Sequence, residues 1–300
     1  MTTLFRYYFT ILLFAALSTK AFGQLEGARA KIDSIAHRIN GIVGAAIIDL
    51  DNGDTLSLHG DYHNPMQSVY KFPLAMAVLD RVDKGTMQLS ASVHIAKSDL
   101  LPNTWSPLRE RYPSGDIDLP LDSLLRYTVS QSDNNGCDIL FRLLGGTGVV
   151  NEFVHTHGIT DMSIVATEEE MHKEWNVQYS NWSTPRAMAR LLQLFHSGKV
   201  LSRQTTDYLW EVMAGTTTAP GRLKGLLPAG TIVAHKTGSS GVNGKGIAAA
   251  TNDVGIIALP NSRYVAIVVF ISDSDASDES RDSVIASIAR AVWDALASKE

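Results

Sequence analysis

The stretch AAATNDVGIIALPNSRYVAIVVFIS, residues 248–272, contains two long apolar runs separated by a short polar turn. The runs cover residues 248–259 and 263–272, and both have the length and the β-branched content that favour strands. Pro260, Asn261 and Ser262 between them are residue types common in turns. Because so short a connection joins antiparallel neighbours, the stretch predicts two adjacent antiparallel strands.

Further strand patterns lie toward both ends of the chain. TIVAHKTG (231–238) precedes the first pair, and IVGAAIIDL (42–50) is joined to TLSLHG (55–60) by an Asp-Asn-Gly-Asp turn. Helical spacing dominates from about residue 68 to 213 and recurs over 25–39 and 277–297. The predicted fold is therefore α+β. A discontinuous α/β domain (24–63 and 216–300) has an antiparallel sheet built from both termini, and an all-helical domain (64–215) is inserted into it.

The first 23 residues have the pattern of a secretory signal peptide. An apolar run follows Arg6, and the small-residue ending Ala21-Phe22-Gly23 predicts cleavage before Gln24. The alternative is a membrane anchor, but the apolar run is short for a spanning helix. We therefore expect a periplasmic protein that is not bound to the membrane once the signal is removed.

The composition argues against several classes of protein. Acidic residues outnumber basic ones by 31 to 26, so the basic patch expected for nucleic-acid binding is not indicated. The single cysteine, Cys137, cannot form an internal disulfide. His155 and His157 form an H-x-H pair without a third ligand at characteristic spacing, so no metal site is predicted. We expect a monomer that needs no cofactor and acts on a small molecule.

Three short motifs stand in order along the chain. Ser68-Val69-Tyr70-Lys71 opens the helical stretch QSVYKFPLAMAVLDRVDKG (67–85), and such an S-x-x-K occurs by chance about once in a chain of this length. Ser132-Asp133-Asn134 follows an apolar helix, and Lys236-Thr237-Gly238 ends a strand. Each of these tripeptides is expected in under about one such chain in ten. A serine hydroxyl is a weak nucleophile without an adjacent base, and Lys71 lies one helical turn after Ser68.

Together the three motifs resemble those of the class A serine β-lactamases, which share them with penicillin-binding proteins. Gln67, the stretch MHKEWNVQY and the stretch KTGSSG are similar to the extended-spectrum branch of that class. The resemblance covers essentially the whole mature chain. It implies hydrolysis of penicillins and cephalosporins, including oxyimino-cephalosporins, through a serine acyl-enzyme that confers antibiotic resistance.

The resemblance also implies roles for individual residues. Ser68 is the expected nucleophile, Lys71 assists proton transfer, Ser132 relays a proton to the leaving nitrogen, and the N–H groups of Ser68 and Ser239 form an oxyanion hole. Substrate contacts are expected from Asn134, Lys236, Thr237, Gly238, Arg222, Ser240 and Trp105. For Arg222 the alternative is a surface arginine, and for Trp105 a tryptophan that only packs.

A second base is expected on the loop ATEEEMHKEWNVQYSNWSTP, residues 166–185. Counting back the family distance from Thr184-Pro185 selects Glu168, and the neighbouring glutamates are expected to face solvent. The family's arginine–aspartate salt bridge cannot form, because its positions are Ala166 and Asn181. The usual asparagine four residues after the glutamate is His172, which either hydrogen-bonds the hydrolytic water or simply packs.

Two other functions use the same acylation chemistry. A penicillin-binding transpeptidase or carboxypeptidase does not need the glutamate loop, and a β-lactam sensor stays acylated. Only a β-lactamase turns over many equivalents of antibiotic, so a deacylation assay separates the three.

Overall fold

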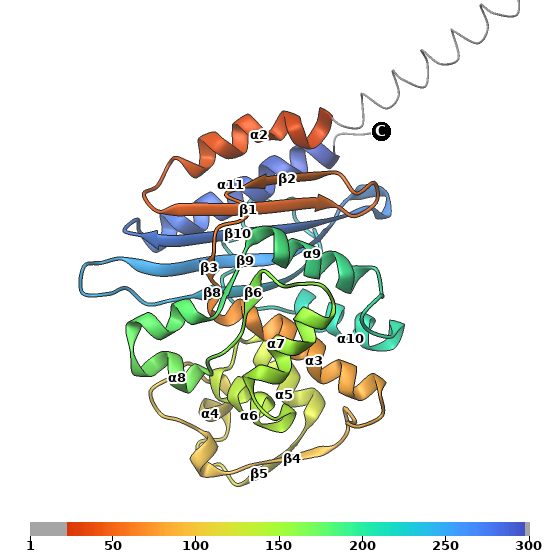
Figure 1. Cartoon of the computed structure of the whole chain (residues 1–300), viewed down its shortest axis with the longest axis vertical. Coiled ribbons are helices and arrows are strands. Elements are labelled where there is room, and N and C mark those ends of the chain that lie inside the picture. Colours follow the sequence, from red (N-terminus) through yellow and green to blue (C-terminus); the bar gives the residue numbers. More distant parts are fainter. Residues whose placement is uncertain (1–22, 298–300) are drawn as a thin grey trace, which may run out of the picture.

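The computed structural model describes residues 23–297, so all of the predicted signal peptide except Gly23 lies outside the described residues. A five-stranded antiparallel sheet has the order β2-β1-β10-β9-β8 (Figure 1). Its strands are β1 (Ile42–Asp49), β2 (Thr55–Leu58), β8 (Val233–Ser239), β9 (Ala248–Ala258) and β10 (Tyr264–Ser274). The predicted α+β fold is confirmed, and strands from both ends of the chain form one sheet.

Strand β10 has an apolar side chain on both faces along most of its length, because both faces of the sheet are covered. Val265, Ile267 and Val269 belong to one core cluster, whereas Val268 and Phe270 belong to the other. Successive side chains of a strand point to opposite faces, so the alternation assigns each residue to one core. Helices α2 (Gly23–Ala36) and α11 (Asp278–Ala297) cover the first face, and α9 (Pro185–His196) covers the second (Figure 1).

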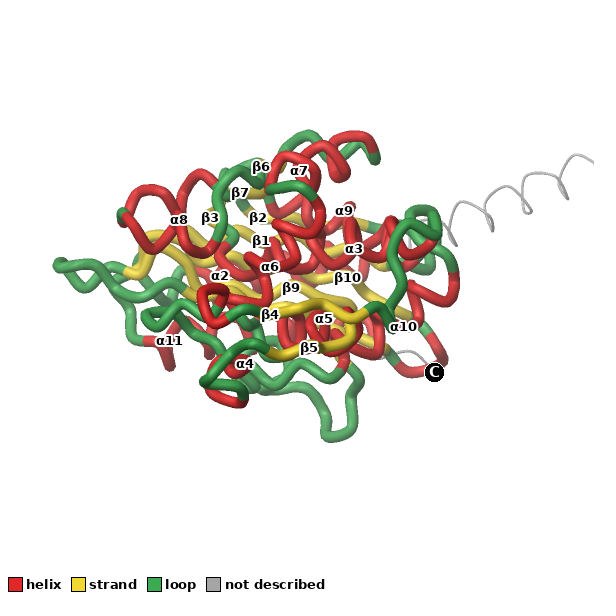
Figure 2. Tube along the Cα trace, turned by 90° about the horizontal axis from the view of Figure 1, so that it is seen from below, coloured by secondary structure: helices red, strands yellow, loops and turns green. Residues whose placement is uncertain are grey.

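Helix α3 (Lys71–Asp83) is the centre of the helical part, and every side chain from Lys71 to Leu79 is buried. It contacts four surrounding helices: α5 (Leu121–Ser130), α6 (Asn134–Leu144), α7 (Thr147–Thr156) and α10 (Arg203–Ala214). Seen from below, these helices lie in front of the sheet (Figure 2). The short helices α4 (Pro107–Arg111) and α8 (Glu168–Lys173) complete this part. No helix among residues 23–297 is both long and apolar enough to span a bilayer.

The structure adds short elements that the sequence did not predict. Two small sheets form from β3 (Asn64–Pro65), β7 (Trp182–Ser183) and β6 (Met162–Ser163), and from β4 (Ser92–Ile95) and β5 (Ile117–Pro120). The 3-10 turns η1 (Gln67–Tyr70), η2 (Lys97–Asp99) and η3 (Trp175–Ser180) are also new, whereas η4 (Pro260–Ser262) is the predicted turn between β9 and β10. The predicted helix therefore begins as the 3-10 turn η1 and becomes α-helical only at Lys71.

Candidate active site

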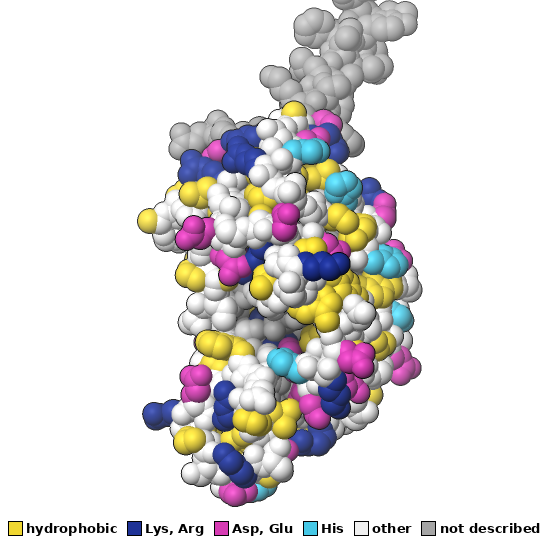
Figure 3. Space-filling view, turned by 90° about the vertical axis from the view of Figure 1, so that its left-hand side faces the viewer, with side chains coloured by type: hydrophobic (Ala, Val, Ile, Leu, Met, Phe, Trp, Pro, Cys, Tyr) yellow, Lys and Arg dark blue, Asp and Glu magenta, His cyan; other side chains and the backbone are white. Residues whose placement is uncertain are grey.

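A cleft of about 640 Å³ opens between the end of β8 and the helical part, at the hollow seen on one face of the molecule (Figure 3). Ten of the residues predicted for the site line it: Ser68, Trp105, Ser132, Asn134, Glu168, His172, Thr237, Gly238, Ser239 and Ser240. The sequence did not predict the other lining residues: Gln67, Met171, Lys173, Glu174, Trp175, Gln178, Thr218, Ala219 and Gly241. Residues far apart in the chain therefore meet in one cavity.

The turn that presents Ser68 has an unusual backbone. Gln67 has φ of +48°, a left-handed conformation that is strained for a side chain other than glycine. Its amide donates to Gln178 Oε1 at 2.5 Å, which joins this turn to η3. Strand β8 passes so close that a Cβ at Gly238 would lie 2.5 Å from the Met66 carbonyl oxygen and 3.2 Å from the Ser68 nitrogen. Glycine at 238 is thus required for the approach of β8 to the serine.

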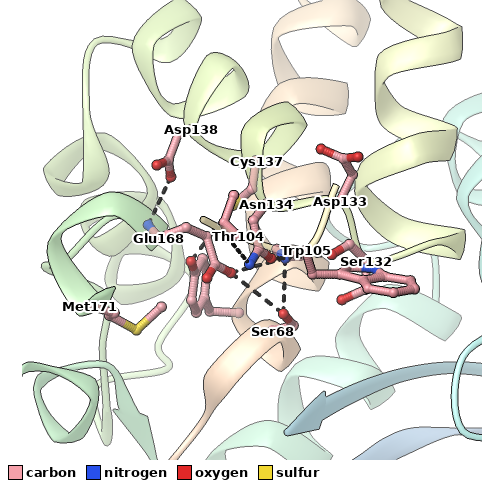
Figure 4. A network of polar contacts seen from close by, with 12 residues as sticks. Ser68, Thr104, Trp105, Ser132, Asp133, Asn134, Cys137, Asp138, Glu168 and Met171 are labelled. Carbon is pink, nitrogen blue, oxygen red and sulfur yellow. Dashed lines mark hydrogen bonds and ion pairs between the residues drawn. The ribbon is translucent and has the colours of Figure 1, made fainter. Parts of the chain in front are cut away.

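Ser68, Asn134 and Glu168 belong to one network of polar contacts (Figure 4), and the fully buried Lys71 contacts all three. Its Nζ is 2.9 Å from Ser68 Oγ, 2.9 Å from the Ser132 carbonyl oxygen and 2.5 Å from Asn134 Oδ1. Glu168 Oε1 lies 2.9 Å from the same nitrogen and 3.5 Å from Ser68 Oγ. The serine hydroxyl therefore faces an amine and a carboxylate at once.

Glu168 is ionised in this network despite its burial. Burial alone raises its pKa, but the charge of Lys71 and the hydrogen bonds that its carboxylate accepts outweigh burial and lower the pKa. Glu169 and Glu170 are exposed, as the sequence predicted for them, and Glu174 is exposed too. Of the four loop glutamates, only Glu168 is both buried and in contact with Ser68.

Lys236 on β8 is a second fully buried lysine, and it contacts Ser132. Lys236 Nζ donates to Ser132 Oγ at 2.8 Å and to the Thr237 carbonyl oxygen at 2.9 Å. Burial, followed by the positive charge of Lys71, lowers the pKa of Lys236 well below its usual range. Because the lysine donates to Ser132 Oγ, the hydroxyl hydrogen of Ser132 is free to point into the cleft.

The start of α6 explains the residue types of the Ser-Asp-Asn motif. Asp133 caps the helix by accepting from the Gly136 N–H at 2.7 Å, and it also accepts from the Leu108 N–H at 2.7 Å. Asn134 accepts from Lys71 and donates to Thr104 Oγ1 at 2.7 Å. Asp133 therefore fixes the two flanking residues that face the cleft.

Trp105 lies at the rim of the cleft with 56% of its surface exposed. Its indole N–H donates to the Gln131 carbonyl oxygen at 2.9 Å, and its own carbonyl oxygen accepts from the Asn134 N–H at 3.0 Å. The ring is therefore anchored at its polar edge while much of its surface stays open to the cleft.

Arg222 lies behind the end of β8 and does not line the cleft. Its guanidinium donates to Ser239 Oγ at 2.8 Å and to the Gly238 carbonyl oxygen at 3.0 Å, and Asp282 accepts from its Nε at 2.7 Å. Thr237 Oγ1 lies 2.6 Å from Thr218 Oγ1, a pair that the sequence did not predict. In this structure Arg222 contacts the strand that lines the site.

One asparagine and one aspartate side chain fix the loop of residues 166–185, which lacks the usual salt bridge. Asn181 Oδ1 accepts from the N–H groups of Val165 and Ala166 at 2.8 and 2.9 Å, and its amide donates back to the Ala166 carbonyl oxygen. Asp138 on α6 accepts from the N–H groups of Glu168 and its neighbour at 2.8 and 2.9 Å. Burial raises the pKa of Asp138 to about 6.

The three histidines considered in the sequence analysis, His155, His157 and His172, have ordinary protein partners. His172 Nδ1 lies 2.7 Å from the Glu168 carbonyl oxygen, and its Nε2 lies 3.4 Å from Thr104 Oγ1. His155 and His157 each contact a backbone carbonyl oxygen. Within residues 23–297 no group of three or more metal-ligating side chains is assembled.

The chain matches the family model described as the Beta-lactamase enzyme family over residues 27–296. It is 48% identical over 272 residues to the β-lactamase VEB-1 of Pseudomonas aeruginosa, with 90% of each chain covered. It is 39% identical to the extended-spectrum β-lactamase PER-1 of the same organism over 95% of this chain and 92% of that one. A solved β-lactamase of Chitinophaga pinensis is 54% identical, with a TM-score of 0.88 and coverage of 90% and 99%.

The fold, the serine–lysine–glutamate site and these matches define one class of enzyme. The chain belongs to the Beta-lactamase enzyme family. It is a β-lactamase, which hydrolyses β-lactam antibiotics and so confers resistance to them.

Proposed function

We propose that this enzyme works through an acyl-enzyme on Ser68. The observation that supports this most strongly is the contact of Lys71 Nζ with both Ser68 Oγ and Glu168 Oε1, each at 2.9 Å. Ser68 Oγ attacks the lactam carbonyl carbon, and its proton leaves toward the Lys71–Glu168 pair. The carbon–nitrogen bond then breaks, the nitrogen takes a proton from the hydroxyl of Ser132, and Ser132 regains the proton that the Lys71–Glu168 pair took from Ser68. The N–H groups of Ser68 and Ser239 stabilise the oxyanion.

Deacylation follows with Glu168 as the general base. Its carboxylate takes a proton from water as the water oxygen attacks the ester carbon, and the proton then returns to Ser68 as its bond to the acyl group breaks. His172 supports the position of Glu168 through the contact of its Nδ1 with the Glu168 carbonyl oxygen. This step is what distinguishes a β-lactamase from a transpeptidase or a sensor that stays acylated.

The substrate range that we propose includes oxyimino-cephalosporins. Lys236 and Thr237 bind the substrate carboxylate, Arg222 fixes the strand end beside them, and Asn134 and Trp105 contact the acylamino side. The cleft of about 640 Å³ and the small residues Ser240 and Gly241 on its wall support bulky substituents. The resemblance to PER-1, whose name includes the words extended-spectrum, supports the same range.

We also propose two domains for the enzyme and a location in the periplasm. The α/β domain comprises residues 24–63 and 216–300, and the helical domain comprises residues 64–215. The enzyme acts in the periplasm as a monomer, after removal of residues 1–23, and it uses neither a metal nor an organic cofactor.

Labelled benzylpenicillin tests the central proposal. The adduct is expected on Ser68 by peptide mass spectrometry, and Ser68→Ala is expected to remove both the adduct and turnover while the protein stays folded. An adduct on another residue would overturn the assignment of the nucleophile. An adduct on Ser68 that does not turn over would identify a sensor or a transpeptidase instead. Turnover of benzylpenicillin without any of ceftazidime or cefotaxime would refute the extended range.

A further inference from the structure

His235 on β8 and Asp253 on β9 form a buried pair that the mechanism does not use. Both side chains are fully buried, and His235 Nδ1 lies 2.9 and 3.0 Å from the two carboxylate oxygens of Asp253. The other ring nitrogen, Nε2, is also buried and has no hydrogen-bond partner within residues 23–297. Nδ1 therefore carries the hydrogen and donates it to the carboxylate, because a buried N–H group without an acceptor is costly.

Asp253 also binds a backbone group of the segment that precedes β8. Its Oδ2 accepts from the Leu223 N–H at 3.1 Å, and Leu223 is itself fully buried. The preceding residue is Arg222, whose guanidinium donates to Ser239 Oγ and to the Gly238 carbonyl oxygen. The carboxylate of Asp253 thus holds the backbone from which the Arg222 side chain extends to the end of β8.

The segment that carries Arg222 runs along the free edge of the sheet. Strand β8 is the outermost strand (Figure 1). Thr216 Oγ1 donates to the His235 carbonyl oxygen at 2.7 Å, and Thr218 Oγ1 lies 2.6 Å from Thr237 Oγ1. Both Thr218 and Thr237 line the cleft. The position of this segment therefore affects the cleft wall on the side of β8.

We propose that the His235–Asp253 pair is a positioning device, which holds Arg222 in place and thereby the substrate-binding end of β8. This inference rests on the substrate contacts proposed for that end of the strand. His235 contacts both oxygens of the carboxylate, so the carboxylate cannot rotate away from Leu223 without losing one of these contacts. Without the histidine, the Leu223 N–H alone would not fix its orientation, and a shift of Leu223 would move Arg222 relative to β8.

Three replacements separate the polar contact of the pair from its volume. His235→Leu removes the donor, whereas His235→Asn keeps a donor nitrogen at the place of Nδ1. Asp253→Asn keeps the volume but leaves one acceptor oxygen for two N–H groups. His235→Leu and Asp253→Asn are expected to lower kcat/KM for benzylpenicillin by about 10- to 10²-fold, because a displacement of about 1 Å that begins far from the reacting atoms can cost that much. His235→Asn is expected to stay close to wild type.

Arg263→Leu is the matched control. Arg263 Nη2 donates at 2.7 Å to the buried carboxylate of Asp49 on β1, which β9 and β10 separate from β8. This control also loses a donor to a buried carboxylate, but its kcat/KM is expected to stay close to wild type. Urea denaturation identifies the variants that are folded under the assay conditions.

Three results would overturn the inference. The first is a wild-type kcat/KM in folded His235→Leu and Asp253→Asn. The second is an equal loss in His235→Asn and His235→Leu, which would show that the donor is not what matters. The third is an equal loss in Arg263→Leu, which would assign the effect to a general weakening of the sheet.

A double-mutant cycle tests whether the pair acts through Arg222. Arg222→Ala alone tests the proposed function: a wild-type kcat/KM would show that the proposed role of Arg222 at the strand end is wrong, and the inference would fall with it. If Arg222→Ala lowers kcat/KM, adding His235→Leu is expected to cause a smaller reduction than it causes in the wild type, because the contact that it disturbs is already lost. Equal reductions in both backgrounds would overturn the inference and leave the proposed function intact.

Discussion

Replacing Asp138 with asparagine removes the charge that binds the loop of Glu168 while keeping the shape of the side chain. In the wild type the carboxylate accepts from two backbone N–H groups at the start of α8. An asparagine retains one acceptor oxygen, so one of these N–H groups loses its partner. The substitution therefore removes a largely buried charge, which favours folding, and one hydrogen bond to the loop of Glu168, which loosens that loop.

The magnitude follows from the pKa of Asp138, which burial raises from 3.8 to about 6. The folded state binds the proton of Asp138 more tightly than the unfolded state does. This protonation therefore stabilises the fold fully below pH 3.8, the pKa of Asp138 in the unfolded chain, and the stabilisation is lost as the pH rises through about 6. A shift of roughly two units corresponds to about 3 kcal/mol. The wild type and Asp138→Asn are thus expected to be similarly stable in acid, with the variant about 3 kcal/mol more stable at neutral pH.

Urea denaturation of both proteins at a series of pH values measures this difference. Activity is expected to change in the opposite direction, because the unpaired N–H loosens the segment that carries Glu168, and deacylation slows. Asp118→Asn, at an exposed position of strand β5, is the control for a general effect of removing a carboxylate. A stability difference that does not vary between acid and neutral pH would refute the reasoning from the buried charge.

Three other predictions concern the cleft. Glu168→Gln is expected to acylate with penicillin but to deacylate about 10²–10⁴ times more slowly, whereas Glu169→Gln deacylates normally; mass spectrometry of the adduct shows both. Lys236→Ala is expected to lower kcat/KM for penicillins and cephalosporins alike, through loss of a charge-assisted contact, and an effect confined to one class would exclude carboxylate recognition. Gly238→Ala is expected to abolish acylation, since its Cβ would meet the Met66 carbonyl oxygen at 2.5 Å; wild-type acylation rates would disprove this.

The long strands and the three motifs could be predicted because each depends on a local pattern. The runs that become β9 and β10 are long enough to show their strand character, and the motif residues keep fixed spacing. Strands β3, β6 and β7 have two residues each, too few for any periodicity, and their pairing depends on distant partners. The left-handed Gln67 had no local signal either, because glycine or asparagine is the usual sign of that conformation.

The loop of Glu168 shows where the sequence was insufficient. The missing salt bridge was evident from Ala166 and Asn181, but the replacement contacts depend on how the loop folds. Asp138 lies four residues after Asn134 on the same helix, and helical spacing could have placed it near the site. Gln178 gave no such signal, because its partner Gln67 is 111 residues away.

The pairing of β1 with β10 has a consequence for how the protein is made. Ile47 pairs with Ile267, so the first strand emerges from the ribosome more than 200 residues before its central partner. Until then the edge of β1 that will pair with β10 is available to other chains, and contacts of such sequence separation form slowly. Chains that end before residue 263 would lack β10, and these incomplete products are expected to aggregate or be degraded rather than accumulate as a folded fragment.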